Sequence, residues 1–156
     1  ACSAVVTELP KGVFMTITPF FDAAGMSTSP YDLALIFRAA MQNSTFREII
    51  AMPRHPFPGY PKRADVPGDV DHPGYLMQTS NHLLLDGDPG VLGGKTGYTD
   101  LARKTFVAGA SRNGRHLVVA LMYGLVKEGG PTYWDQAAAL LDWGFALGPN
   151  PGISRL

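Results

Sequence analysis

One dipeptide restricts the fold of this chain more than any other feature. Asn113-Gly114 stands between two β-rich runs. Both central residues of a two-residue hairpin turn need positive φ, which asparagine and glycine adopt at little steric cost. The pattern therefore predicts an antiparallel hairpin over residues 104–123. Residues 117–122 are apolar at every position, so both faces of the sheet that contains them must be covered.

A helix is predicted well before this hairpin. Ser29 is a suitable N-cap, Pro30 suits the first helical position, and Asp32 lies near the positive end of the helix. Apolar residues at three- and four-residue spacing continue the helix to about Gln42. They are Leu33, Ile36, Phe37, Ala40 and Met41.

Two more helices are predicted from capping patterns. A short one is expected to start at Thr45, with Glu48 completing a capping box. The last helix is expected to have Thr132 as its N-cap and Asp135 at the third helical position. Its apolar stripe comprises Trp134, Ala137, Ala138, Leu141 and Phe145. We expect this stripe to pack on the hairpin, because so apolar a helix must bury one side.

Composition argues against several classes of function. The 13 Lys and Arg residues are scattered and are balanced by 13 Asp and Glu, so there is no electrostatic footprint for nucleic acid. No apolar run reaches the 18 or so residues that a membrane-spanning helix needs. The first six residues lack the basic and apolar regions of a signal peptide. Cys2 is the only cysteine and has no partner for an internal disulfide.

Proline interrupts residues 53–74 and predicts a loop or an extended excursion there. His55 and His72 are 17 positions apart without a cluster of further ligands, so we do not expect a metal site. The signals in residues 1–25 are weak. A turn at residues 9–12 and a short strand at residues 13–18 are the only expectations for that part.

The most informative segment is residues 93–100, Gly-Gly-Lys-Thr-Gly-Tyr-Thr-Asp, which invites two interpretations. A phosphate-binding P-loop would need glycine five places before Gly94, where Pro89 stands; Gly90 is one place off. A P-loop must also open a helix whose N-terminus faces the phosphate. A hairpin follows this segment instead, so the spacing and the context both argue against a P-loop.

The same segment resembles the K-T-G strand of the serine penicillin-recognising enzymes. With the hairpin that follows, it is similar to D-alanyl-D-alanine carboxypeptidases of the low-molecular-weight penicillin-binding class. Three further segments agree with that family: residues 26–34, 79–84 and 140–145. K-T-G alone is a weak three-letter match, but its order among these segments makes the resemblance specific. The resemblance implies an α+β fold of the β-lactamase/transpeptidase type.

The resemblance also implies how the chain is divided. Residues 1–25 are a leader of uncertain match, residues 26–148 are the carboxy-terminal part of the carboxypeptidase domain, and residues 149–156 are a tail. We expect the matched part to supply three antiparallel strands, with K-T-G on an edge strand, and the last helix across them. In the family, the nucleophile-bearing helix of the missing amino-terminal part is expected to cover the other face. Without it, we expect the chain to be poorly stable alone, or to recruit residues 30–50 or a second copy to hide that face.

The family's site residues fall on five positions here. Lys95 would attract the terminal carboxylate of the substrate and favour proton movement among nearby hydroxyls. Thr96 would donate its hydroxyl to that carboxylate, and Thr99 would be a second contact. Gly97 would let a peptide lie against the strand edge. The backbone N–H of Tyr98 would belong to the oxyanion hole.

This sequence departs from the family in its other motifs. The family needs a nucleophilic serine three residues before an activating lysine, S-x-x-K. No serine here meets that test; Ser44 comes nearest, but Arg47 stays protonated and cannot act as a base. We also expect no S-x-N motif, because Ser80-Asn81 lacks the intervening residue. The chain is therefore interpreted as a fragment without a nucleophile, inactive by itself.

The resemblance implies a serine-type carboxypeptidase that removes the terminal D-Ala from peptidoglycan stem peptides through an acyl-enzyme. It also implies binding of β-lactam antibiotics, a place in the cell envelope, and no metal or organic cofactor. A second chain or copy would complete the fold. One alternative is a β-lactamase of the same fold, although the insert at residues 53–74 and the continuation at residues 98–100 favour the carboxypeptidase. The other alternative is a non-catalytic module that binds peptidoglycan or a partner chain.

Overall fold

A computed structural model describes residues 3–8, 28–126 and 128–147, and of residues 3–8 only the backbone. Its main feature is a four-stranded antiparallel sheet in the order β1-β6-β5-β4. These strands are β1 (Ser3–Glu8), β4 (Val91–Thr99), β5 (Arg103–Arg112) and β6 (Arg115–Met122). β1 was not predicted, although Val5, Val6 and Thr7 are β-branched residues that favour a strand. The strand expected at residues 13–18 lies outside the described residues.

The hairpin predicted over residues 104–123 is confirmed. β5 and β6 pair antiparallel up to Arg112 opposite Arg115, which leaves a two-residue turn. In this turn Asn113 has φ 52° and Gly114 has φ 76°, as the twist of a type I′ turn requires. Asn113-Gly114 therefore forms the turn between the two strands that it predicted.

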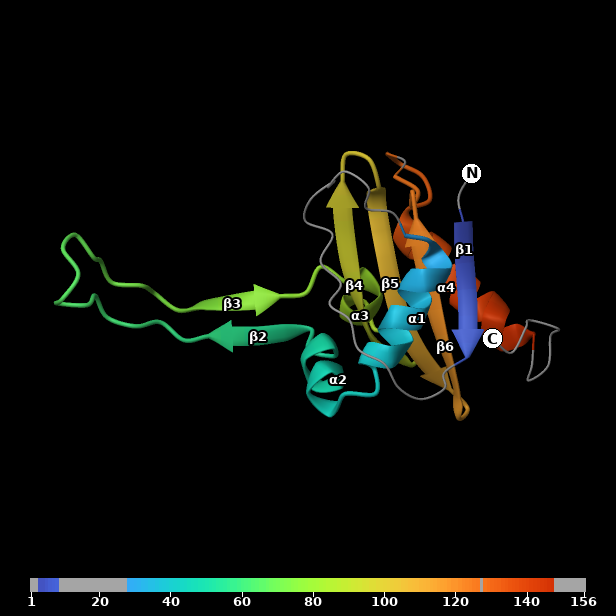
Figure 1. Ribbon diagram of the computed structural model, residues 1–156, viewed down its shortest axis with the longest axis horizontal. Helices are drawn as coiled ribbons and strands as arrows, with labels where there is room; N and C mark the ends of the chain where they lie inside the picture. Colours follow the sequence, from blue (N-terminus) through green and yellow to red (C-terminus); the bar gives the residue numbers. More distant parts are fainter. Residues whose placement is uncertain (1–2, 9–27, 127, 148–156) are drawn as a thin grey trace.

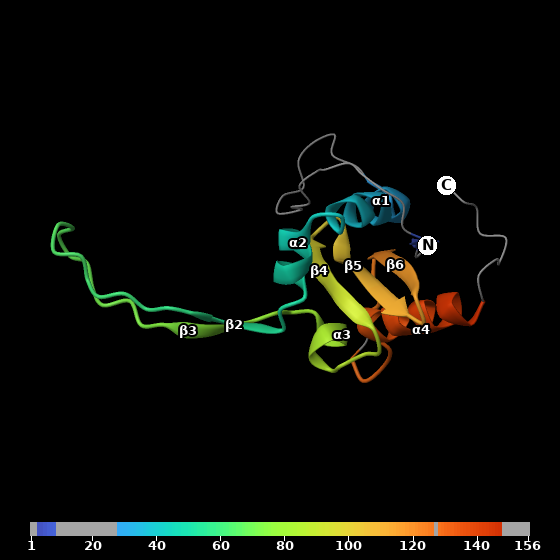
Figure 2. The ribbon, with the colours of Figure 1, turned by 90° about the horizontal axis from the view of Figure 1, so that it is seen from below.

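Helices cover both faces of this sheet (Figures 1 and 2). On one face lies α1 (Pro30–Ala40), whose buried side chains pack against Val107, Val118 and Ala120. On the other lies α4 (Tyr133–Ala146), which packs against a cluster that includes Phe106 and Leu121. The apolar strands are therefore covered within this chain, and of the alternatives for the second cover the structure shows residues 30–50 in that place.

The caps of α1 and α4 follow the sequence analysis, but the cap of α2 does not. Ser29 and Asp32 form a capping box at α1. The short helix α2 (Ser44–Ile50) has Asn43 as its N-cap, with Asn43 Oδ1 accepting a hydrogen bond from Phe46 N at 2.9 Å. The predicted start at Thr45 and its capping box with Glu48 are wrong, because asparagine is as strong an N-cap as threonine and stands two residues earlier.

Arginine side chains fix the position of α4 on the hairpin. Arg115 donates hydrogen bonds to the carbonyls of Gly144 (3.2 Å) and Phe145 (3.0 Å), in the last turn of α4. A cation there satisfies backbone acceptors and complements the negative end of the helix dipole. Arg112, at the end of β5, pairs with Asp142 on α4 and with Asp88. The turn end of the hairpin is thereby tied to the last helix.

The capping box of α4 allows a test of its contribution to stability. Thr132 Oγ1 accepts from Asp135 N, and Thr132 donates from its N–H and its hydroxyl to Asp135 Oδ2 at 2.7 and 2.8 Å. The two hydrogen bonds that Asp135 Oδ2 accepts, from the backbone and then the side chain of Thr132, lower the pKa of Asp135. The Asp135 carboxylate therefore stabilises the fold above its unfolded-state pKa, and this stabilisation is lost as pH falls through its folded-state pKa.

We expect Thr132→Ala to lower the free energy of unfolding by about 1 kcal/mol. The pKa of Asp135 should rise part-way toward its ordinary value, because the hydroxyl donor is removed and the backbone donor stays. Urea unfolding and a pH titration of the Asp135 carboxyl by NMR measure the two effects. An unchanged unfolding free energy would show that the capping box does not stabilise α4.

A two-stranded arm extends away from the body of the molecule (Figures 1 and 2). It is formed by β2 (Arg54–Phe57) and β3 (Tyr75–Gln78), so the predicted excursion at residues 53–74 is confirmed as an extended one. Toward its tip, His72 lies 2.8 Å from Asp69 and stacks on Tyr60. Among the described residues, no three His, Cys, Asp or Glu side chains gather as metal ligands, and no helix is long and apolar enough to cross a membrane.

Candidate active site

The K-T-G residues lie on an edge strand. β4 pairs with β5 on one side and, within the described sheet, with no strand on the other. Lys95 and Tyr98 are exposed, and Thr96 and Gly97 are half-buried. Such an edge presents unpaired backbone groups to which an extended peptide can add as a further strand. The structure thus brings the five predicted site positions, residues 95–99, to one open edge.

Strand alternation divides these side chains between the two faces of the sheet. Thr96 is paired with Phe106 and Tyr98 with Lys104, and Phe106 belongs to the core under α4. Lys95 is paired with Val107, whose side chain belongs to the core under α1. Thr96 and Tyr98 therefore share the α4 face, whereas Lys95, Gly97 and Thr99 belong to the α1 face. Because β4 is an edge strand, both sets can still reach a ligand lying along it.

Two glycines let neighbouring segments approach the start of the motif. Gly93 has φ 135°, and a Cβ there would lie 2.6 Å from the carbonyl oxygen of Ile50 in α2. A Cβ on Gly94 would lie 2.7 Å from the Val107 carbonyl oxygen and 3.0 Å from Asn81 Nδ2. Side chains at either position would push α2 or the Asn81 segment away from β4. The glycines before Lys95 are therefore part of how the strand is packed.

Ser80 lies beside the predicted site and was not among the predicted site residues. Its Oγ lies 2.9 Å from Thr96 Oγ1, so one hydroxyl donates to the other. The next residue, Asn81, is buried, caps the short helix α3 (His82–Leu85), and holds Ser80 beside β4. The available signal was the resemblance of residues 79–84 to a segment that the family places before K-T-G.

The remaining side chains have the following partners. The Lys95 ammonium donates to the carbonyl oxygen of Thr96 and forms no ion pair among the described residues. Thr99 Oγ1 accepts from Ala102 N at 3.0 Å, in the turn to β5. The hydroxyl of Tyr98 donates to Asp100 at 3.4 Å. Lys95 thus keeps an unneutralised charge at the strand edge, which is what carboxylate binding requires.

The prediction that the chain has no S-x-N motif is wrong, because Ser111-Arg112-Asn113 matches that pattern. These residues end β5 and form the hairpin turn, where Asn113 adopts φ 52°. Ser111 lies four positions along β5 from Val107, the partner of Lys95, which is roughly 13 Å. The triplet is part of the hairpin and lies away from the K-T-G site. No serine of the sequence stands three places before a lysine.

Comparison with known proteins identifies the family. The model of one protein family, described as D-alanyl-D-alanine carboxypeptidase, matches residues 13–124. This chain belongs to that family. The match begins inside the segment that the sequence analysis set apart as a leader. D-alanyl-D-alanine carboxypeptidase DacB2 of Mycobacterium tuberculosis is 53% identical over 133 residues, which are 85% of this chain and 41% of that protein.

Solved structures of family members have the same fold. A crystal structure of a D-alanyl-D-alanine carboxypeptidase from Mycobacterium tuberculosis matches with 55% sequence identity and a TM-score of 0.61, covering 76% of this chain and 40% of that one. A mutant of a Streptomyces DD-transpeptidase matches with 25% identity and a TM-score of 0.60, covering 77% and 43%. This chain therefore spans about two fifths of the length of these relatives. The part matched by the family model includes Lys95-Thr96-Gly97.

Proposed function

We propose that these 156 residues are the K-T-G-bearing part of a serine-type D-alanyl-D-alanine carboxypeptidase that acts on peptidoglycan stem peptides outside the cytoplasm. The observation that supports this most directly is the placement of Lys95, Thr96 and Tyr98 on an exposed edge strand, in a chain of this family. The serine nucleophile would come from a segment that supplies S-x-x-K and S-x-N. No metal or organic cofactor takes part.

We assign a binding task to each position. A peptide adds to the free edge of β4, with its terminal carboxylate near the ammonium of Lys95 and the hydroxyl of Thr96. Ser80 orients the Thr96 hydroxyl through their 2.9 Å contact. Thr99 is a further carboxylate contact from the other face. Gly97 leaves the strand edge open to the peptide backbone.

The backbone of Tyr98 supplies the electrostatic part of the reaction. When a serine attacks the carbonyl between the two D-Ala residues, negative charge develops on the carbonyl oxygen. The N–H of Tyr98 stabilises this charge together with the N–H of the nucleophile. D-Ala leaves, and water then hydrolyses the acyl-enzyme. A β-lactam has the same carboxylate and carbonyl, so it would occupy the same edge and acylate the same serine.

A labelling experiment tests the proposal. We expect the purified 156-residue chain to form no covalent adduct with a fluorescent penicillin, because none of its serines has an activating lysine three places on. A chimera in which this chain replaces the matching two fifths of the Mycobacterium tuberculosis relative should be acylated stoichiometrically and should release D-Ala from a D-Ala-D-Ala peptide. Intact-protein mass spectrometry and a D-Ala assay measure the two outcomes.

A control and three contradicting results complete the labelling experiment. The same chimera with alanine in place of its S-x-x-K serine should neither be labelled nor release D-Ala. Stoichiometric labelling of the 156-residue chain by itself would contradict the proposal that the nucleophile lies elsewhere. A folded chimera that binds the peptide but neither labels nor hydrolyses would favour the non-catalytic peptidoglycan-binding module. A chimera that hydrolyses penicillin faster than the peptide would favour a β-lactamase.

A further inference from the structure

The hydroxyls of Ser80 and Thr96 form a pair whose direction depends on the ligand. Their oxygens lie 2.9 Å apart, and either hydroxyl can be the donor. A hydroxyl has a single proton. If Thr96 gives its proton to the terminal carboxylate of the substrate, it can only accept from Ser80. The bound state then contains one chain of hydrogen bonds, which runs from Ser80 through Thr96 to the carboxylate.

Ser80 is brought to Thr96 by the base of the arm. The arm projects past β4, the outermost strand of the sheet on that side, in both views (Figures 1 and 2). After β3 ends at Gln78, the N–H of Thr79 donates to the carbonyl of Pro53 at 2.9 Å, which closes the base of the arm. Ser80 follows directly and is exposed, so a ligand on the free edge of β4 can approach the hydroxyl pair.

Asn81, the next residue, joins the base of the arm to α3. It is only 1% exposed. Its backbone N–H donates to Thr79 Oγ1 at 3.2 Å, on the side of the arm. On the side of α3, its Oδ1 accepts from the N–H of Leu84 at 3.4 Å and its carbonyl accepts from the N–H of Leu85 at 3.1 Å. The backbone next to Ser80 is therefore held from both directions.

The other end of the Asn81 amide lies over Gly94 of β4. A Cβ on Gly94 would lie only 3.0 Å from Asn81 Nδ2, so the amide occupies the space that a side chain at position 94 would fill. Gly94 and Thr96 are two residues apart on one strand and share a face of the sheet. Asn81 Nδ2 is buried and has no acceptor among the described residues. Buried polar groups nearly always have a partner, so packing alone would favour an apolar side chain at this position.

Contacts between helices fix α3 in turn. The ring of His82, in α3, lies 5.2 Å from the ring of Trp134, in α4, measured between centroids. The Trp134 ring also lies 4.9 Å from that of Phe106, the cross-strand partner of Thr96. The two hydroxyls are therefore linked through α3, α4 and β5 as well as by their own hydrogen bond.

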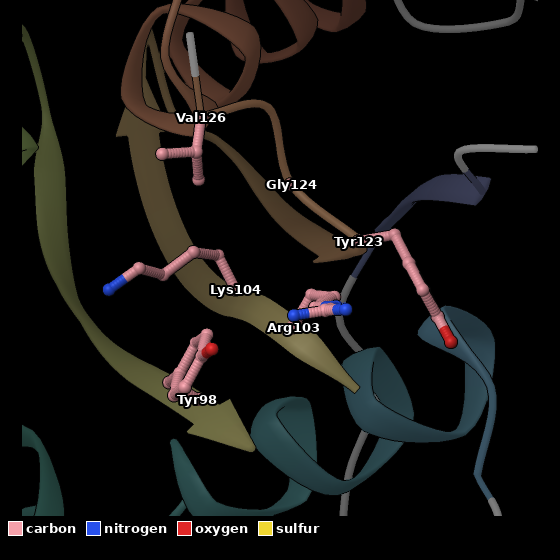
Figure 3. A pocket seen from close by; sticks show the side chains of 6 residues that line it. All are labelled: Tyr98, Arg103, Lys104, Tyr123, Gly124 and Val126. Atoms are coloured by element: carbon pink, nitrogen blue, oxygen red, sulfur yellow. The ribbon is translucent and has the colours of Figure 1, made fainter. Parts of the chain in front are cut away.

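A pocket of ≈ 580 Å³ beside Tyr98 is a separate feature (Figure 3). Six residues line it: Tyr98, Arg103, Lys104, Tyr123, Gly124 and Val126. Apart from Tyr98, they belong to the start of β5 and to the segment after β6, so the pocket lies on the side of β4 opposite its free edge. Its two cations are therefore not placed to assist the hydroxyl pair.

We propose that Asn81 is a positioning residue of the site, an inference that rests on the proposed function. Lodged against Gly94, it holds the Ser80 hydroxyl where that group donates to Thr96. The Thr96 proton is then left for the terminal carboxylate. Asparagine suits this place because its Oδ1 caps α3 while its flat amide fits over a glycine. Hydrogen bonds in a chain that ends on a charged acceptor strengthen one another, so this arrangement favours peptides with a free carboxylate.

The chimera described above tests this role with two substrates, a peptide ending in D-Ala-D-Ala and the same peptide with its terminal carboxylate amidated. Ser80→Ala removes the donor, and Asn81→Ser removes the amide but keeps an N-cap for α3. In both variants the preference for the carboxylate peptide should fall about fivefold. The loss should appear mainly in KM, because the carboxylate is charged both before and during attack by the serine. Mass spectrometry of the shortened peptide measures both reactions.

The matched control is Ser111→Ala, which removes a serine hydroxyl away from the K-T-G site and should leave the preference unchanged. An undiminished preference in Ser80→Ala would overturn the chain of hydrogen bonds. If Ser80→Ala loses the preference but a folded Asn81→Ser keeps it, Asn81 does not position the pair. Equal losses of kcat/KM for the two peptides would show a general structural effect and would also overturn the inference.

NMR of the 156-residue chain distinguishes failure of this inference from failure of the carboxypeptidase proposal. Three-bond couplings of the Thr96 methyl carbon report the χ1 rotamer of that side chain. We expect one rotamer in the parent chain and averaging over rotamers in Ser80→Ala and Asn81→Ser. Averaging in the parent chain, or a single unchanged rotamer in both variants, would overturn the positioning role. If the parent chimera is neither labelled by penicillin nor releases D-Ala, the proposed activity is wrong, and the rotamer measurement still decides whether Asn81 positions the pair.

Discussion

Lys95→Ala in the unlabelled chimera is expected to lower kcat/KM for D-Ala release by about two to three powers of ten. The ammonium of Lys95 lies on an edge strand and forms no ion pair among the described residues, so its charge is available to the substrate carboxylate and to the reacting hydroxyls. Its loss removes an electrostatic contribution that the alanine cannot replace. A D-Ala assay with the D-Ala-D-Ala peptide measures the effect.

The same substitution should leave the domain folded. Lys95 is exposed, so alanine there creates no buried cavity, and the melting temperature should change little. Lys62→Ala removes a lysine from the arm and should preserve both activity and stability. Normal turnover in the Lys95 variant would contradict the role of Lys95. A large loss of stability would show that its effect on activity comes from unfolding.

The elements predicted well from the sequence are those with strong local signals. Asn113-Gly114 fixed the hairpin because few residues adopt positive φ twice in succession. The capping boxes of α1 and α4 were readable because each places a hydroxyl and a carboxylate three residues apart. The K-T-G positions were readable because the hairpin that follows them gives the motif its context. These features depend on neighbours in the sequence.

The features that were missed depend on distant segments. β1 owes its place in the sheet to pairing with β6, more than a hundred residues away in sequence. Ser80 acquires its part in the site only because Thr96 is brought to 2.9 Å from it. The pocket beside Tyr98 is lined by residues from the end of β4, the start of β5 and the segment after β6. No local sequence pattern predicts the positive φ of Arg103 or Tyr123. The spacing of residues within a short segment does not predict tertiary contacts between segments that are far apart in the sequence.

Phe37→Ala is expected to destabilise the isolated 156-residue chain most strongly among substitutions outside the site. Phe37 is fully buried at the centre of the contact between α1 and the sheet, where it packs with Val107 and Val118. Its ring also lies against Gly109, where an added Cβ would be only 3.2 Å away. Removing such a ring costs about 3–5 kcal/mol, because its transfer energy is lost and a cavity remains.

That cost is comparable with the whole stability of a small domain, about 5–15 kcal/mol. The strands under α1 are apolar on both faces, so loosening α1 would expose Val107, Val118 and Ala120 to water. We therefore expect the variant to lose the cooperative thermal transition of the parent chain or to self-associate. Circular dichroism melting and analytical ultracentrifugation at low micromolar concentration measure both outcomes.

The matched control is Phe57→Ala, on the arm. Phe57 is 44% exposed and stacks on Tyr75 at 5.2 Å, so its loss should cost no more than about 1.5 kcal/mol. The two variants remove the same ring and differ in its burial. If Phe37→Ala melts cooperatively within a few degrees of the parent and stays monomeric, α1 does not stabilise the sheet, and another segment must cover that face. If it alone loses the transition, the cover supplied by residues 30–40 is what keeps this sheet folded in the 156-residue chain.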